Sequence, residues 1–208
     1  MSPFRSVAPV AACLLLCLAL PLYAQGAGSY AGSLSFGHAF VVDVDDPDPT
    51  GGSSFTGSIE RRTAGRAMSI GVEAGRHRYY RHYQNLTPDV TGWSNTLEDD
   101  RQTWRITPYV RWRTRGAVSI HVQVGAGVYV QHTSYFQQDR QGTVTVYETS
   151  YEARRAKLGL NLGVGAELLI PGTPVGLGLG LRTHAGGAGF NSAEIGLVWR
   201  TGGNRVRR

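Results

Sequence analysis

The sequence predicts an all-β fold, an eight-stranded antiparallel up-and-down transmembrane β-barrel, on three observations. Two stretches, Val118–Val130 and Ala156–Leu168, alternate strictly between apolar residues and polar or small ones. Such alternation places every aliphatic side chain on one face of a strand. Both stretches exceed the roughly 9–11 tilted residues that cross a bilayer as a strand. Weaker alternation recurs in six further segments, and short turns alternate with long loops between them.

The first 24 residues are predicted to be a signal peptide and are set apart from the fold. Arg5 supplies the positive charge, Val10–Leu20 the apolar segment, and small residues follow, so we expect cleavage after Ala24 or Gly26. The barrel is then expected over residues 25–200, with a polar tail at residues 201–208.

Composition excludes several classes of protein. Both cysteines, Cys13 and Cys17, lie in the predicted signal peptide, so the mature chain is not stapled by disulfides. After Leu20 no apolar run is long enough for a membrane-spanning helix. The net charge of +6 is compatible with nucleic acid binding, but export and the inward placement of several arginines argue against such a partner.

Four strands are predicted before Thr114. With their outward-facing residues they are Tyr30–Asp43 (Leu34, Phe36, Phe40, Val42), Ser53–Arg62 (Phe55, Ile59), Ala67–Tyr83 (Met68, Ile70, Val72, Ala74) and Arg101–Arg113 (Trp104, Ile106, Val110, Trp112). Pro108 lies inside the fourth strand. Because proline cannot donate to a β-ladder, we expect a β-bulge there.

Four more strands are predicted after Ala117. The fifth begins at Val118, the sixth ends at Ile170, the seventh covers Val175–Arg182 and the eighth covers Ser192–Arg200. The fifth and sixth are expected to continue beyond the membrane as a protruding hairpin around residues 139–142, with Tyr135, Phe136, Tyr147 and Tyr151 on its walls.

The connections indicate the orientation in the membrane. Long loops follow the first, third and fifth strands, including residues 43–52 and 85–100, whereas turns of about four residues follow the second, fourth and sixth. This arrangement is typical of outer-membrane barrels, with the turns and both termini in the periplasm. A soluble β-sandwich is the alternative, but no helix covers the apolar faces that nearly every strand presents.

Aromatic residues provide an independent indication of membrane insertion. Tyr30, Trp112 and Trp199 face outward near the predicted periplasmic ends, and Phe55, Tyr80 and Trp104 face outward toward the opposite ends. Two aromatic girdles are expected where amphipathic rings meet the membrane interfaces.

The strand motifs Val124–Tyr129, Leu158–Glu167 and Val175–Arg182 resemble those of the small OmpA/OmpX-type outer-membrane barrels. The resemblance covers essentially the whole mature chain. It implies location in the cell outer membrane, contact with membrane lipid and lipopolysaccharide, and recognition by the outer-membrane assembly machinery. Proteins of this family usually end on an aromatic residue, whereas here Trp199 is followed by a polar tail.

Charged residues are predicted to fill the lumen. The inward-facing set is Glu60, Glu73, Arg105, Arg111, His121, Lys157, Glu167, Arg182 and Glu194. Counting from the turns places Arg182 near Glu194, Glu73 near Arg105, and Arg111 near His121 and Glu167. Because buried charges must be paired, we expect a structural ion-pair network, with a narrow ion path through the same residues as the alternative.

Two surface features suggest activities. The segment Arg76–Tyr83 is rich in basic and aromatic residues, and Arg76, Arg78 and Arg81 are candidates for lipopolysaccharide contact. The triplet His132–Ser134 has the spacing of the His-x-Ser pair of lipid A deacylases, with Glu148 or Glu152 as a possible acid. The residues that normally follow that serine are absent.

The sequence therefore favours a monomeric, non-enzymatic outer-membrane protein with surface-exposed loops, either structural, adhesive or in contact with lipopolysaccharide. A narrow channel and a lipid A deacylase-like hydrolase are the alternatives. No metal site, cofactor or nucleic acid partner is expected.

Overall fold

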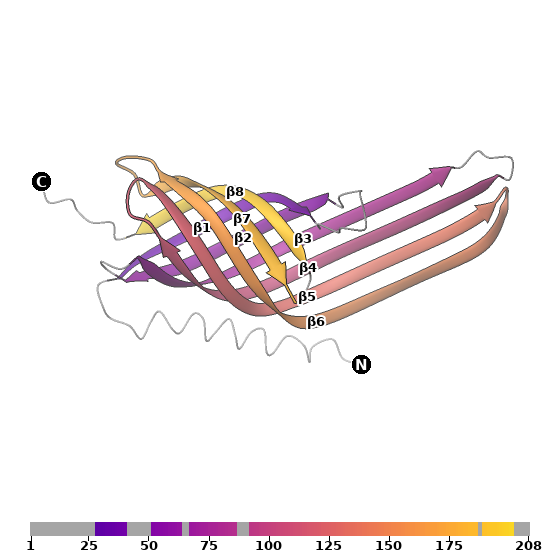
Figure 1. Ribbon diagram of the computed structural model, residues 1–208, viewed down its shortest axis with the longest axis horizontal. Coiled ribbons are helices and arrows are strands. Elements are labelled where there is room, and N and C mark those ends of the chain that lie inside the picture. The colour runs from indigo at the N-terminus through magenta and orange to yellow at the C-terminus, as the bar shows by residue number, and fades with distance from the viewer. Residues whose placement is uncertain (1–27, 41–50, 64–66, 87–91, 187–188, 202–208) are drawn as a thin grey trace, which may run out of the picture.

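Eight antiparallel strands form a closed barrel in the computed structural model, which describes residues 28–40, 51–63, 67–86, 92–186 and 189–201 (Figure 1). The strands are β1 (Gly28–Phe40), β2 (Gly51–Thr63), β3 (Met68–Leu86), β4 (Trp93–Arg113), β5 (Val118–Gln141), β6 (Val144–Leu169), β7 (Val175–Ala185) and β8 (Phe190–Thr201). Each strand pairs with the next, and β8 pairs with β1, for example Trp199 with Gly32. The predicted fold class is confirmed.

The outer surface of the barrel is apolar because alternate residues of each strand point away from the lumen. The exposed side chains include Leu34, Phe36, Ile59, Ile70, Ile120, Val122, Val124, Leu158, Leu160, Leu162, Leu177, Leu179, Leu181, Ile195 and Leu197. Their inward neighbours are buried and mostly polar. A closed ring of strands with its apolar side chains outside is a transmembrane β-barrel.

The strand connections are sorted by end. The turns after β4 and β6 lie at one end together with Gly28, Thr63 and Thr201, and we call this the turn end (Figure 1). The opposite end is the loop end. The predicted signal peptide and all of the predicted tail except Thr201 lie outside the described residues, as does most of the loop predicted at residues 43–52. Within the described part of the chain, no helix is long and apolar enough to cross a membrane.

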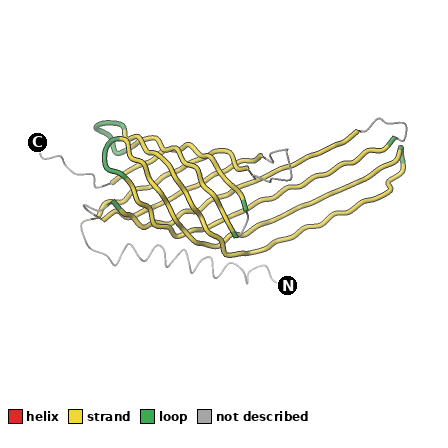
Figure 2. Tube along the Cα trace, viewed as in Figure 1, coloured by secondary structure: helices red, strands yellow, loops and turns green. Residues whose placement is uncertain are grey.

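The barrel carries a four-stranded projection at the loop end (Figure 2). We define the sheet extension as residues 80–86 of β3, 93–103 of β4, 131–141 of β5 and 144–157 of β6. The prediction of a two-stranded hairpin was wrong in this respect, because β4 begins at Trp93 instead of Arg101 and β3 continues to Leu86. The predicted loop at residues 85–100 is largely strand.

In the sheet extension many of the paired residues are polar, so the sequence there shows no alternation of apolar residues. The Asn95 amide donates to Asp139 at 2.6 Å, and the Gln138 amide donates to Glu148 at 2.6 Å. Nδ1 of His82 lies 3.4 Å from the carboxylate of Glu98. Cross-strand pairs of this kind stabilise a sheet that is wet on both faces.

The bulge predicted at Pro108 is absent. Ile106 pairs with Val128 and Tyr109 with Gly125, so the register between β4 and β5 is the same on both sides of the proline. On the other side, Val72 pairs with Pro108 without interruption. Pro108 has no N–H to donate, so the β4–β5 ladder is interrupted locally. The pairs on both sides of the proline keep the same register. A register shift occurs instead between Asp139 and Arg140, near the tip of the sheet extension.

Candidate functional site

The lumen is filled by three layers of side chains, stacked from the loop end to the turn end. We call the first the aromatic cap, the second the central cluster and the third the turn-end cluster. Their members come from strands distant in sequence because every strand contributes inward-facing residues to the same narrow interior.

The aromatic cap consists of His77, Tyr79, Tyr129, His184 and Phe190, all buried. The ring centroids of His184 and Phe190 lie 4.2 Å apart, and those of His77 and Phe190 lie 4.4 Å apart. The Tyr129 hydroxyl lies 3.1 Å from Nδ1 of His184, within hydrogen-bond distance. This layer closes the lumen below the sheet extension.

The central cluster consists of Glu73, Arg105, Arg182 and Glu194. Arg105 pairs with Glu73, and Arg182 pairs with Glu194 while lying 2.9 Å from the second oxygen of Glu73. Hydroxyl groups complete the shell of Glu194, which accepts hydrogen bonds from Ser35, Ser54, Thr56 and Ser192. Two carboxylates face two guanidinium groups, so the formal charge of this layer is zero.

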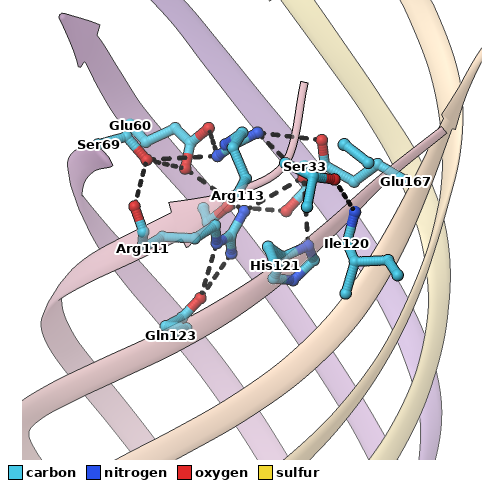
Figure 3. A network of polar contacts seen from close by, with 12 residues as sticks. Ser33, Glu60, Ser69, Arg111, Arg113, Ile120, His121, Gln123 and Glu167 are labelled. Carbon is cyan, nitrogen blue, oxygen red and sulfur yellow. Dashed lines mark hydrogen bonds and ion pairs between the residues drawn. The ribbon is translucent and has the colours of Figure 1, made fainter. Parts of the chain in front are cut away.

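The turn-end cluster consists of Glu60, Arg62, Arg111, Arg113, Glu167 and Arg200, and Figure 3 shows its core. Arg113 pairs with both carboxylates, at 3.1 Å from Glu167. Arg111 lies 3.4 Å from each carboxylate, and its guanidinium also donates to the amide oxygen of Gln123 at 2.6 Å.

Two more arginines complete this cluster from β2 and β8. Arg62 lies 3.0 Å from Glu60, and Arg200 lies 2.7 Å from Glu167. Nδ1 of His121 is 3.9 Å from Glu167, at the margin of an ion pair. Four guanidinium groups therefore share two carboxylates.

Only small spaces separate these layers. One cavity of about 30 Å³ lies between the central and turn-end clusters, where Arg111, Glu167, Arg182 and Glu194 are part of its lining. A second, of about 10 Å³, adjoins Glu60, Arg62 and Arg200. Cavities of this size hold single water molecules.

The structure brings together most of the predicted lumen residues. Glu73 meets Arg105, Arg182 meets Glu194, and Arg111 meets Glu167 with His121 beside them. Lys157 does not join them. It is exposed because it lies beyond the last residue of β6 that pairs with β7, Leu160.

Several members of the layers were not named by the sequence prediction. Arg62 and Arg200 have the same inward parity as Glu60 and Glu194 on their own strands, and parity alone could have placed them. The same holds for His77 and His184, which lie on the inward parity of β3 and β7.

The predicted girdle residues all lie exposed on the outer surface: Tyr30, Phe55, Tyr80, Trp104, Trp112 and Trp199. Trp112 pairs with Met68, the first residue of β3, and Trp199 pairs with Gly32 near the start of β1, so both lie toward the turn end. Trp104 pairs with Arg76 and lies toward the loop end.

Two of the three arginines predicted to contact lipopolysaccharide, Arg76 and Arg78, have defined side-chain contacts. The guanidinium of Arg76 lies over the ring of Trp104, 5.3 Å from its centroid. Arg78 makes a bidentate pair with Asp100, with distances of 3.1 and 2.7 Å. Arg81 pairs with Asp99 in the ladder, and its side chain lies outside the described part of the structure.

The deacylase-like triplet does not form a hydrogen-bonded unit in the described structure. In the β5–β6 ladder His132 lies opposite Arg154 and Ser134 opposite Glu152. The carboxylate of Glu148 accepts its hydrogen bond from Gln138. Within the residues that are described, no group of three or more His, Cys, Asp and Glu side chains is arranged to hold a metal ion.

Comparison with known proteins relates this chain to barrels at the level of the fold. No protein-family model and no curated protein matches the sequence. The structure is similar to that of Ail, the attachment invasion locus protein of Yersinia pestis, both in complex with the heparin analogue sucrose octasulfate (TM-score 0.52) and without it (TM-score 0.50). Each match has 14% identity and covers 84% of this chain and 99% of Ail.

A further match is Neisserial surface protein A, with 14% identity, a TM-score of 0.42, and coverage of 85% of this chain and 97% of that protein. Together with the eight-stranded ring and its apolar outer face, the similarity to Ail shows that this chain has the fold of the small outer-membrane barrels.

Proposed function

We propose that this protein is a non-enzymatic surface protein of the outer membrane, which contacts lipopolysaccharide at its loop-end rim and presents the sheet extension beyond it. The observation that carries the proposal is the contrast between a lumen filled by three layers of side chains and a large projecting sheet. A molecule built in this way offers its outer surface to partners and leaves no route for a solute.

The loop-end rim has the chemistry to bind the phosphate groups of lipopolysaccharide. An exposed tryptophan ring such as that of Trp104 is typical of a membrane interface, and Arg76 lies over it in a cation–π contact. Arg78 lies two residues further along β3 on the same face. Guanidinium groups at this depth are suited to bidentate contacts with phosphate.

The sheet extension is the proposed adhesive part. It carries exposed aromatic side chains on β6, Tyr147 and Tyr151, and the ring of Tyr151 stacks on Tyr135 with centroids 5.3 Å apart. Exposed aromatic surface on the same strand as the exposed side chain of Lys157 is suited to anionic sugars. The complex of Ail with sucrose octasulfate supports testing ligands of this chemistry.

Arg76 and Arg78 provide the test. We expect the urea midpoint of unfolding to be higher in bilayers that contain lipopolysaccharide than in phosphatidylcholine alone, because guanidinium–phosphate contacts stabilise the folded state. The double variant R76Q/R78Q should lose at least half of this increase.

The matched control is R154Q/R155Q, which removes the same charge from β6 in the sheet extension and should keep the increase. Equal increases in wild type and R76Q/R78Q would refute the proposed rim contact.

A further inference from the structure

The turn-end cluster carries buried positive charge that its own carboxylates do not balance. Its four arginine side chains are largely shielded from solvent, with exposed fractions of 4% for Arg111, 8% for Arg113, 16% for Arg62 and 18% for Arg200. The two carboxylates, of Glu60 and Glu167, are 2% and 4% exposed. Four positive and two negative groups leave a formal excess of two positive charges.

No acidic residue in the adjoining sequence is available to cancel this excess. The segments that precede β1, join β2 to β3 and follow β8 (residues 1–27, 64–66 and 202–208) contain no Asp or Glu. Apart from the four carboxylates of the lumen clusters, the acidic residues of the chain lie at positions 43–48, 89, 98–100, 139, 148 and 152. Those positions belong to the loop after β1, the loop after β3 or the sheet extension.

The central cluster shows that the barrel can balance charge when the site is purely structural. There, Glu73 and Glu194 match Arg105 and Arg182 one for one. Uncompensated charge in a buried site is strongly destabilising, so an excess at the turn end indicates a missing anionic partner.

Unpaired hydrogen-bond donors lie in the same cluster. The Nε atoms of Arg113 and Arg200 are buried and have no hydrogen-bond partner among the described residues. A cavity of about 10 Å³ is lined by Glu60, Arg62, Arg111, Glu167 and Arg200, among others. Buried donors without an acceptor are rare in folded proteins, and an oxyanion supplies both negative charge and several acceptors.

We propose that the turn-end cluster binds a small oxyanion of the phosphate class, reached from the periplasmic side. Arg62 and Arg200 are the most exposed members of the cluster, and movement of their flexible side chains opens the mouth to the anion. Guanidinium groups bind tetrahedral oxyanions through paired N–H donors. The bound group is either a free oxyanion or the phosphate of a phospholipid headgroup, which present the same chemistry.

The test measures the urea midpoint of unfolding in dodecyl maltoside micelles, whose headgroups carry no phosphate, with sodium phosphate compared against sodium chloride at equal ionic strength. A ligand that binds only the folded state raises the midpoint with its concentration. We expect a rise with phosphate and little with chloride. The variant R62Q/R200Q, whose cluster is formally neutral, should lose the phosphate response.

The control variant R154Q/R155Q removes the same net charge from the sheet extension and should keep the response. A second arm replaces phosphate with phosphatidylglycerol in mixed micelles with the same phosphate-free detergent. A rise in this arm alone identifies a lipid phosphate as the source, whereas a rise with inorganic phosphate identifies a free anion.

Absence of a rise in both arms, or an unchanged response in R62Q/R200Q, would overturn the proposal. If R62Q/R200Q does not fold, the ³¹P line width of phosphate in the presence of the wild-type protein decides the question. Broadening that sulfate reverses supports the site, and an unbroadened line refutes it.

Discussion

At the scale of single residues, the barrel interior depends on complete pairing of a few charges. Glu73 is fully buried: Arg105 and Asn161 donate hydrogen bonds to one of its oxygens, and Arg182 forms an ion pair with the other. A buried pair contributes little net stability compared with apolar packing, but removal of one partner leaves the other charge unpaired and is strongly destabilising.

The substitution Glu73→Gln tests this dependence. The amide group keeps the shape of the side chain but loses the charge that neutralises Arg105 and Arg182, so we expect a loss of about 3–5 kcal/mol in the free energy of unfolding. Urea unfolding followed by tryptophan fluorescence measures it.

The control is Glu148→Gln in the sheet extension, where the carboxylate is exposed and accepts one hydrogen bond. Its effect should stay within about 0.5 kcal/mol. Equal effects of the two substitutions would contradict the structural role of the central cluster.

At the scale of elements, the sheet extension differs from the barrel that supports it. Beyond the pair Leu160–Ala185, β6 has no β7 neighbour, and beyond Tyr79, β3 has no β2 partner. The extension therefore ends in two strand edges. Exposed Glu148, Glu152 and Arg154 lie along the β6 edge, and charged side chains at an edge oppose pairing with other chains.

Deletion of the hairpin that β5 and β6 form in the sheet extension tests whether the barrel folds without it. Thr133 and Ala153 are paired opposite each other, so residues 134–152 can be replaced by the two-residue turn Asn-Gly. All three lumen layers lie outside the deleted segment, and we expect the shortened protein to assemble and to keep its folded mobility on an SDS gel.

The shortened protein should also keep the stabilisation by lipopolysaccharide, because Arg76 and Arg78 remain. A protein that aggregates after this deletion would show instead that the barrel needs β5 and β6 at full length to close.

At the scale of the whole molecule, closure of the barrel wall and filling of the lumen act together. The ring of hydrogen bonds leaves no open edge within the barrel wall, and the three layers occupy its interior. From a closed barrel with a filled lumen we expect stability in a bilayer and no conductance.

Two measurements on the purified protein check this combination. The unboiled protein should migrate differently from the boiled protein on an SDS gel, because the closed barrel resists the detergent until it is heated. In planar bilayers the same preparation should show no discrete conductance steps.

A stable open channel in planar bilayers would contradict the closed lumen. A protein recovered from the periplasm without a mobility shift would contradict insertion in the membrane. The two outcomes are independent, because a barrel can insert and still conduct.

Much of the barrel was predictable because period-two alternation reports directly which face of a strand is buried. The same parity places Glu73, Arg105, Arg182 and Glu194 inside. Short turns keep neighbouring antiparallel strands in a simple register, so counting residues from each turn was enough to match Arg182 with Glu194. These inferences use only neighbours along the chain.

The sheet extension was not predictable in this way, and neither was the set of arginines that surrounds the two carboxylates of the turn-end cluster. The polar run at residues 98–100 has the composition of a loop, and strand pairing there depends on β3 and β5 on either side. The excess charge of the turn-end cluster arises because β2, β4 and β8 bring four arginines to two carboxylates, Glu60 on β2 and Glu167 on β6. The sequence was enough to predict the barrel portions of the strands, their faces and most of the inward charges, since these depend on local periodicity. Only closure of the barrel decided which charges meet, because that depends on distances across the lumen between strands far apart in the chain.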